Sequence, residues 1–213
     1  MTTEHAAPGG QDLRIRRRRQ TTHDVSGTAL LLFSTRGFAS TTVEEIAAEA
    51  GISPRTFFRY FATKEDAALF GFIEIDDALD ELHLAGTDPE AAVTAIQSLY
   101  SGLLEDMQGP RLERFVQVQR LTETVPSIKH AADSRFRDMT RKISDVLVEA
   151  LGPDRTLEAR VAAEVQAAVL HAALDDWSNK GPYDHSALTS YRAALGVLDR
   201  KSSRPREEEE HSA

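Results

Sequence analysis

Apolar residues recur every three to four positions along most of this chain, which is the period of an amphipathic α-helix. The first clear stripe consists of Val25, Ala29, Leu32 and Phe33, and Gly37 stands where a helix of this length would end. No segment of the sequence has the sustained alternation of apolar and polar residues that marks a half-buried strand. The hydrophobic pattern therefore predicts an all-α protein.

Capping residues mark where the next helices begin. Thr42 and Glu45 have the spacing of a capping box, which predicts a short helix that Gly51 ends. Ser53 followed by Pro54 predicts the start of a third helix, because Pro is well tolerated at the first helical position. These two helices and the tight turn between them have the spacing of a helix-turn-helix.

Later helices are separated by Gly and Pro residues, which interrupt helical patterns. We expect a long fourth helix from about residue 63 to 84, then helices at about 87–107, 115–121, 128–151, 156–179 and 184–198. The chain then contains about nine helices. By composition we expect a disordered lead-in at 1–13, a helix-turn-helix domain at 14–66, a larger helical domain at 67–200 and a disordered acidic tail at 201–213.

The 213 residues carry a net charge of −9, which at first disfavours a nucleic-acid partner. The charge is unevenly placed, however, because residues 14–64 contain nine Lys and Arg against four Asp and Glu. A nucleic acid responds to the local potential, since salt screens charges more than about 10 Å away. The basic N-terminal region therefore remains a candidate for DNA binding.

Several classes of function lack the residues that they need. The sequence has no cysteine, which excludes disulfides, thiol catalysis and sulfur-bound zinc. Its seven histidines are far apart, and it contains no helical metal-binding pair, nucleophile motif or phosphate-binding loop. No apolar run approaches the roughly 20 residues of a membrane span, and the N-terminus does not read as a secretory signal. We expect a cytoplasmic protein that is not an enzyme and has no metal site, cofactor or membrane partner.

The stretch 42–61, TVEEIAAEAGISPRTFFRYF, is the most informative part of the sequence. Ile46, Ala47 and Phe57 have the spacing to face inward and hold the two helices together. The exposed set on the second helix is then Arg55, Thr56, Phe58, Arg59 and Tyr60. A DNA major groove about 12 Å wide admits one helix, whose N-terminal side chains meet base edges. We therefore expect this exposed set to contact DNA.

A basic run, formed by Arg16, Arg17, Arg18 and Arg19, precedes the first apolar stripe. Two interpretations remain open: a solubilising tail, or a flexible arm that lies on the DNA backbone or in a neighbouring minor groove. The position of the run just before a helix-turn-helix favours the arm.

The segment LFSTRGFASTTVEEIAAEAGISPRTFFRYFATKEDAAL combines an aromatic-Gly-Phe turn, a Thr-Thr cap, a small-residue helix, a Gly-Ile-Ser turn, an aromatic-rich helix and a following Lys. With these elements in register, the region from about Thr21 to Phe70 resembles the DNA-binding domain of the TetR family of bacterial transcriptional regulators. The resemblance implies a homodimer that binds a palindromic double-stranded DNA operator, usually as a repressor. It also implies release of the operator when a small molecule binds the larger helical domain.

The same resemblance implies roles for individual residues. The counterparts of Arg55, Thr56 and Phe58 approach bases, and those of Thr42, Tyr60 and Lys64 bind phosphates. Phe58 departs from the Tyr that is common in the family, so apolar contact, for instance with a thymine methyl group, replaces a hydroxyl contact.

For the larger domain, the resemblance implies a ligand pocket and a dimer interface. Candidate lining residues are large and apolar: Phe70, Phe115, Met139, Leu170 and Trp177. The helix that carries Trp177 and the last helix are amphipathic, and family members pair such helices between subunits in a four-helix bundle. Two alternatives remain open: an architectural or adaptor protein without ligand control, and a transcriptional activator.

Overall fold

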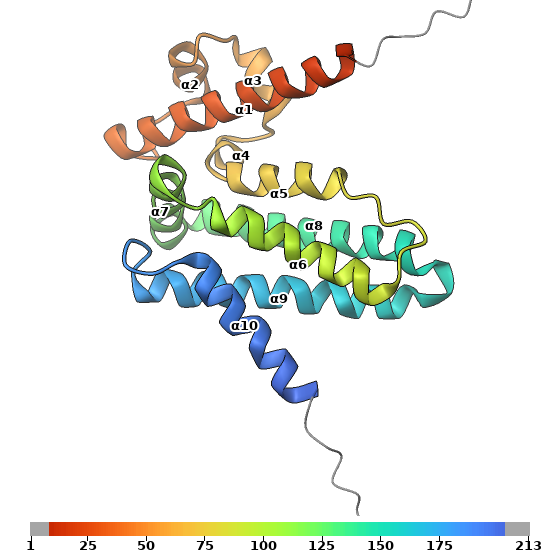
Figure 1. Cartoon of the computed structure of the whole chain (residues 1–213). Helices are drawn as coiled ribbons and strands as arrows, with labels where there is room; N and C mark the ends of the chain where they lie inside the picture. Colours follow the sequence, from red (N-terminus) through yellow and green to blue (C-terminus); the bar gives the residue numbers. More distant parts are fainter. Residues whose placement is uncertain (1–8, 203–213) are drawn as a thin grey trace, which may run out of the picture. The chain divides into compact units, whose positions relative to one another are not determined.

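The computed structural model describes residues 9–202, which are almost entirely helical (Figure 1). The helices are α1 Gly9–Arg36, α2 Val43–Glu49, α3 Pro54–Tyr60, α4 Lys64–Ala68, α5 Phe70–Asp80, α6 Pro89–Glu105, α7 Gly109–Thr124, α8 Pro126–Leu151, α9 Thr156–Lys180 and α10 Ala187–Ser202, with a short 3₁₀ turn, η1, at Pro153–Arg155. The prediction of an all-α protein is confirmed, with ten α-helices among the described residues rather than about nine.

Two compact units make up the chain. The first unit runs up to Asp77 and includes Leu112–Asp138, and the second contains Ala78–Arg111 and the chain from Met139 onward. The boundary predicted after residue 66 does not coincide with this division. Ile128 explains part of the difference, because this residue of α8 is fully buried in the same core as α1 to α4.

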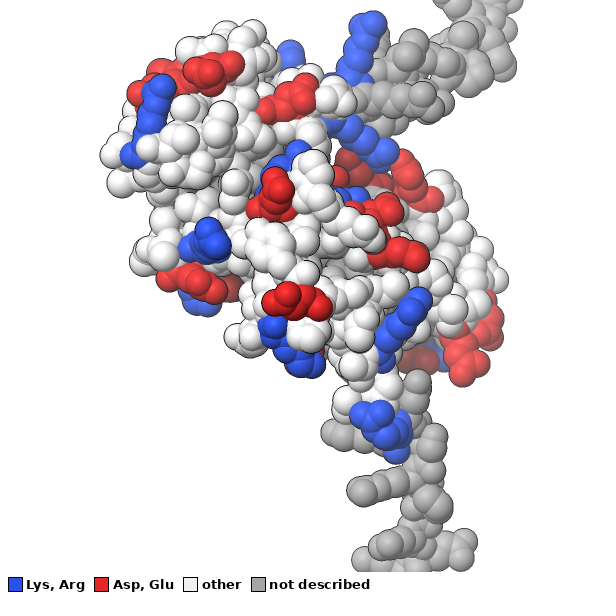
Figure 2. All heavy atoms as spheres, turned by 60° about the vertical axis from the view of Figure 1, so that its left-hand side comes forward, with Lys and Arg blue, Asp and Glu red and all other residues white. Residues whose placement is uncertain are grey.

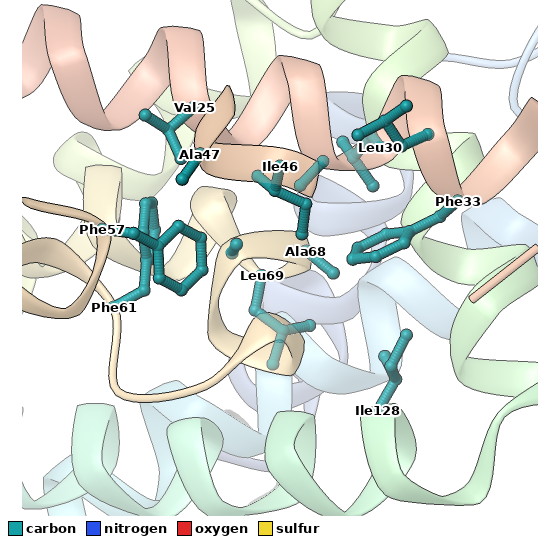
Figure 3. Packing of buried hydrophobic residues seen from close by; sticks show 13 residues of the cluster. Val25, Leu30, Phe33, Ile46, Ala47, Phe57, Phe61, Ala68, Leu69 and Ile128 are labelled. Atoms are coloured by element: carbon teal, nitrogen blue, oxygen red, sulfur yellow. The ribbon is translucent and has the colours of Figure 1, made fainter. Parts of the chain in front are cut away.

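A single core holds α1, α2, α3 and α4 together in the first unit (Figure 3). Phe57 of α3 is fully buried, and its ring lies 5.3 Å from that of Phe61. Ala47 of α2 is also fully buried, with Val25 and Phe57 next to it in Figure 3. A larger side chain at Ala47 would force the helices apart, because well-packed cores accommodate added atoms only with strain. The inward positions predicted for the helix-turn-helix are therefore confirmed.

The long fourth helix predicted for residues 63–84 is instead two helices, α4 and α5. Leu69 interrupts it with φ −96° and ψ 35°, and its amide donates to the carbonyl of Asp66 at 3.1 Å. Such a three-residue bond tightens the end of a helix. Leu69 is 2% exposed and belongs to the first unit's core, so tertiary packing overrides the local helical pattern at this residue.

Both ends of the helical region extend further than composition suggests. α1 begins at Gly9, so residues 9–13 are helical and not part of a disordered lead-in. α10 continues to Ser202, two residues into the expected tail. Leu and Arg occur near both ends, together with Gln11 at the first and Lys201 at the second, and their high helix propensity favours the extensions. Residues 1–8 and 203–213 lie outside the described residues.

In the second unit, α6, α9 and α10 pack against one another. Trp177 of α9 is 1% exposed, and its indole Nε1 donates to the carbonyl of His185 at 2.8 Å, which ties α9 to the segment before α10. Tyr100 of α6 and Tyr191 of α10 meet edge to face, with ring centroids 6.1 Å apart. Small residues on the buried face of α9, among them Ala163 and Ala167, allow this close helix packing.

Candidate nucleic-acid interface

The turn before α2 is fixed by its cap. Thr42 Oγ1 accepts from the amide of Glu45 at 3.2 Å, and Glu45 Oε2 accepts from the amide of Thr42 at 2.9 Å. The predicted capping box is therefore confirmed. The hydrogen bond from the Thr42 amide holds the pKa of Glu45 below its usual value, because it stabilises the charged carboxylate.

α3 is positioned by its own cap and by one buried ring. Ser53 Oγ accepts from the amide of Thr56 at 3.1 Å, and Pro54 occupies the first helical position, as predicted. The Thr56 hydroxyl lies 2.9 Å from Ser53 Oγ, so Thr56 belongs to the cap as well as to the exposed set. Gly51 takes φ 68°, a left-handed conformation that favours glycine and allows the tight turn between α2 and α3.

The outward face of α3 carries charged and aromatic side chains. Arg55, Phe58 and Arg59 are exposed. The side chain of Phe58 is 55% exposed, although its ring packs edge to face with that of Phe57, with the ring centroids 5.6 Å apart. Arg59 Nη2 donates to Tyr60 Oη at 3.1 Å, and the guanidinium lies 4.9 Å from the centre of the Tyr60 ring. α3 therefore offers guanidinium groups, a phenol and an exposed ring on one short helix.

The side chain of Lys64 lies against the protein and does not extend into solvent. Its ammonium donates to the carbonyl of Phe38 at 2.8 Å and to the carbonyl of Thr41 at 2.9 Å. It also lies 4.3 Å from the centre of the Phe38 ring. The ammonium group that the resemblance assigns to a DNA phosphate thus donates to two protein carbonyls in this structure.

The basic run lies within α1 and is helical rather than a flexible arm. Arg17 and Arg18 are exposed, whereas Arg19 Nε donates to Asp77 Oδ2 of α5 at 2.9 Å. The side chain of Arg16 lies outside the described residues. On the face drawn in Figure 2, acidic and basic side chains are interspersed and form no large patch of one sign. Of the four arginines, Arg17 and Arg18 are therefore the two whose side chains the structure places in solvent.

The candidate pocket residues are divided between the two units. Phe115 belongs to the first unit and is half-buried, and the side chain of Phe70 lies outside the described residues. Met139, Leu170 and Trp177 are buried in the second unit. The five residues thus do not form one cluster within a single unit.

Sequence reasoning missed two buried polar groups in the second unit and one part-buried ion pair in the first unit. In the second unit, Gln166 Oε1 of α9 and Tyr191 Oη of α10 are buried without a hydrogen-bond partner in the described part of the chain. Burial also raises the pKa of the Tyr191 hydroxyl, so this group stays neutral. In the first unit, Asp66 pairs with Arg135, which lies 69 positions away along the chain. The sequence alone does not show that the polar atoms of Gln166 and Tyr191 are buried, because both residue types are also common on the exposed faces of amphipathic helices.

Other site chemistries have no counterpart in the described residues. Within residues 9–202, no group of three His, Asp or Glu side chains is arranged to hold a metal ion. Over the same part of the chain, no helix combines the length and the apolar character of a membrane span.

Comparison with known proteins assigns the helix-turn-helix to a family. The family model described as bacterial regulatory proteins, tetR family, matches residues 27–68. The HTH-type transcriptional regulator TcmR of Streptomyces glaucescens is 30% identical over 201 residues, which cover 91% of this chain and 89% of TcmR. The chain belongs to the TetR family of bacterial regulators. As a TetR-family protein it is a DNA-binding regulator of transcription, and α2 and α3 are its helix-turn-helix.

Two further similarities are weaker, because one covers a short segment and the other has low sequence identity. YerO of Bacillus subtilis, an uncharacterised HTH-type transcriptional regulator, is 50% identical over 38 residues, 18% of this chain and 13% of YerO. FadR of Thermus thermophilus, a TetR-family repressor in complex with lauroyl-CoA, is 20% identical and aligns with 90% of this chain and all of its own, at a TM-score of 0.47. A likeness at this level carries no argument about the ligand of the present protein.

Proposed function

We propose that this TetR-family regulator is a homodimeric repressor that binds a palindromic operator through α3 and releases it when a small molecule binds the second unit. The observation that carries the proposal is the division of α3 into two faces. Phe57 is fully buried, whereas Arg55, Phe58 and Arg59 are exposed. This arrangement supports insertion of α3 into a major groove, because the helix is held rigidly while its reading side chains remain accessible.

Within α3, Arg55 is the candidate for base recognition, with Thr56 and Phe58 beside it. A guanidinium forms a bidentate contact with guanine, and such a contact discriminates bases by about 1–3 kcal/mol. Phe58 supplies an exposed apolar ring that suits a thymine methyl group. Thr56 lies at the start of α3, where base edges are nearest in this docking geometry.

Phosphate contacts are proposed for side chains around these base readers. Tyr60 and Arg59 lie together near the end of α3, and Thr42 is exposed at the start of α2. The Thr42 hydroxyl lies 3.3 Å from Glu45 Oε2, so a phosphate would compete with that carboxylate for the hydroxyl proton. Arg17 and Arg18 of α1 add two exposed guanidinium groups, which suit the DNA backbone.

An exposed apolar stripe on α9 supports the proposed homodimer. Leu157 is 75% exposed and Val161 is 55% exposed, and Ala168 and Ala172 follow at helical spacing on the same side. Val197 of α10 is also exposed, at 44%. Helices with exposed apolar and small residues suit a bundle with a second copy of the chain, in which these residues become buried.

For the ligand, the second unit offers polar groups in an apolar surrounding. Gln166 Oε1 can accept a hydrogen bond, and the neutral Tyr191 hydroxyl can donate or accept one. Met139, Leu170 and Trp177 supply buried apolar surface in the same unit. We propose an uncharged effector with at least one hydrogen-bonding group, because none of these five side chains carries a charge that could replace the hydration of an ion.

The test is selection of binding fragments from random or genomic duplexes by the purified protein, followed by affinity measurements on the best fragment at two salt concentrations. Recovery of a palindrome that binds much more tightly than an unrelated duplex supports the proposal. Binding that is weak, salt-sensitive and equal on every sequence contradicts it. A small molecule that releases the operator must bind the free protein more tightly than the operator complex by the same factor.

A further inference from the structure

Phe58 is a large apolar side chain that α3 leaves in solvent. It is 55% exposed, whereas Phe57, the residue before it, is fully buried. With about 3.6 residues per helical turn, Arg55 and Arg59 lie on the same side of α3 as Phe58. Phe57 lies on the opposite side, in the core. The exposed ring is therefore part of the surface that α3 presents to DNA in the proposed mode.

The Phe58 ring is supported by a second ring from the core. It packs edge to face with Phe57, at an interplanar angle of 87°. Phe57 in turn packs against Phe61, which is 2% exposed, and Figure 3 shows these two rings side by side. An apolar group that is held in place but exposed to water gains from contact with an apolar partner and loses little conformational freedom on binding.

The DNA major groove offers few apolar groups to such a ring. Base edges there present hydrogen-bond donors and acceptors, and the C5-methyl group of thymine is the apolar exception. A cytosine that is methylated on C5 carries the same group at the same edge of the pyrimidine. Because the Phe58 side chain has no hydrogen-bonding atom, it distinguishes bases by this methyl group.

Arg55 lies three residues before Phe58, so the two side chains are neighbours on the helix surface. A helical rise of about 1.5 Å per residue separates them by about 4.5 Å along α3, which is similar to the step of about 3.4 Å between base pairs. The guanidinium of Arg59 is instead turned toward Tyr60, whose ring centre lies 4.9 Å away. Arg55 and Phe58 are therefore placed to read neighbouring base pairs.

We propose that Phe58 makes operator affinity depend on a pyrimidine C5-methyl group within about two base pairs of the guanine that Arg55 reads, and that methylation of a cytosine at this position strengthens binding. The inference rests on the proposed insertion of α3 into the major groove. It adds to that function a response to a chemical modification of the operator. Loss of the methyl group leaves the ring against water, while the hydrogen bonds of the base pair stay unchanged.

The first experiment keeps the wild-type protein and changes single methyl groups of the DNA. An operator is selected from random unmodified duplexes, and each thymine of a half-site is replaced in turn by deoxyuridine, which lacks only the methyl group. We expect one thymine per half-site at which this exchange weakens binding about three- to fivefold, and about tenfold or more when both half-sites are changed. At the same position, 5-methylcytosine should bind more tightly than cytosine by a similar factor.

The second experiment repeats both exchanges with Phe58→Ala. This variant should bind thymine and deoxyuridine equally, and cytosine and 5-methylcytosine equally, because the apolar surface that meets the methyl group is gone. Phe58→Leu, which keeps apolar surface, should retain part of the dependence. Leu31→Ala is the matched control, since Leu31 is 56% exposed on α1 of the same unit and its replacement should leave both ratios unchanged. The Tm of each variant reports whether it folds.

The possible outcomes separate the alternatives. Equal binding of thymine and deoxyuridine by the wild-type protein at every position overturns the inference, and so does a dependence that persists at full size in Phe58→Ala. An effect of deoxyuridine without a matching effect of 5-methylcytosine overturns the response to methylation. If Phe58→Ala does not fold, the exchanges with the wild-type protein and with Phe58→Leu decide. Failure to select any operator is seen before a base is exchanged and contradicts the proposed function, and this inference with it.

Discussion

Arg135 of α8 binds Asp66 of α4 through two hydrogen bonds to a single carboxylate oxygen. Arg135 Nη2 lies 2.7 Å and Nε 3.2 Å from Asp66 Oδ1, and the Asp66 side chain is 12% exposed. The second oxygen, Oδ2, accepts from the amide and hydroxyl of Thr63, each at 3.1 Å. One carboxylate therefore caps α4 and also attaches this helix to α8 within the first unit.

Arg135→Gln should lower the free energy of unfolding by about 1–2 kcal/mol, because the largely buried carboxylate of Asp66 loses a charged partner. Chemical denaturation at neutral pH measures the change. Arg137→Gln is the control, since Arg137 is exposed on the same helix and its replacement removes the same charge. Equal stability of the two variants would show that the ion pair contributes nothing.

Glu45→Gln should make stability less dependent on pH. The amide of Thr42 holds the pKa of Glu45 below the ordinary value of 4.5, so the folded protein binds this proton more weakly than the unfolded chain does. The stabilising effect is therefore present above pH 4.5 and is lost as the pH falls through the lower folded-state pKa. Denaturation of wild type and variant at about pH 7 and about pH 3 should show a difference that shrinks in acid. A difference that is the same at both pH values would contradict this assignment, and Glu44→Gln serves as the exposed neighbouring control.

Arg55→Ala should relax base preference at one position of each half-site. The loss of discrimination between the best base and its alternatives is expected to be about 1–3 kcal/mol. Because Arg55 is exposed, Tm should stay unchanged. Arg18→Ala is the comparison, since removal of a backbone contact weakens all sequences similarly and reduces the salt slope by about 1. Competition binding with single-base operator variants distinguishes the two; a uniform loss for Arg55→Ala would exclude a base-reading role.

Leu157→Glu combined with Val161→Glu should convert the proposed dimer to a monomer and weaken operator binding. Both side chains are mostly exposed in one chain, so the substitutions disturb little of the chain's own core but place charge in an interface with a second copy. Light scattering coupled to size exclusion measures the mass. Leu31→Glu is a matched control in the first unit, where Leu31 is 56% exposed on α1. A double variant that keeps the dimer mass would rule out this face of α9.

Tyr191→Phe should leave stability unchanged or raise it by up to about 1 kcal/mol while it weakens the response to the effector. The substitution removes a buried hydroxyl that has no partner in the described part of the chain and keeps the ring that meets Tyr100. Thermal unfolding measures the change in stability, and effector titration of the operator complex measures the response to the effector. Tyr183→Phe, at an exposed tyrosine, is the control. A clear loss of stability would mean that the hydroxyl is satisfied in solution, for instance by water.

The helix-turn-helix could be predicted from the sequence because its determinants are local. Thr42, Glu45 and Ser53 act on backbone groups within three residues, and Phe57 follows from helical spacing. The interruption at Leu69 could not be predicted in this way, because leucine favours helices and the nearby Gly71 lies within α5, so packing against the first unit's core decides it. The ion pair between Asp66 and Arg135 could not be predicted from the sequence either, since Arg135 is one of several arginines on an amphipathic helix.

The placement of Lys64 shows a second limit of sequence reasoning. A lysine at the start of a helix beside a DNA-reading motif predicts a phosphate contact. The side chain is long enough to turn back, however, and the carbonyls of Phe38 and Thr41 lie within its reach. Which partner a lysine takes depends on the fold of the turn 23 to 26 residues earlier in the chain, and no local pattern reports that.

Within α3, whose seven residues are all described, Phe57 alone is buried. The exposed side chains proposed to meet DNA, Arg55, Phe58 and Arg59, therefore contribute little to folding, and substitutions among them are nearly free of selection for stability. After a gene duplication, such a regulator can acquire a new operator by a few exchanges at exposed positions while Phe57 keeps the helix in place. Recognition evolves separately from the fold that presents it.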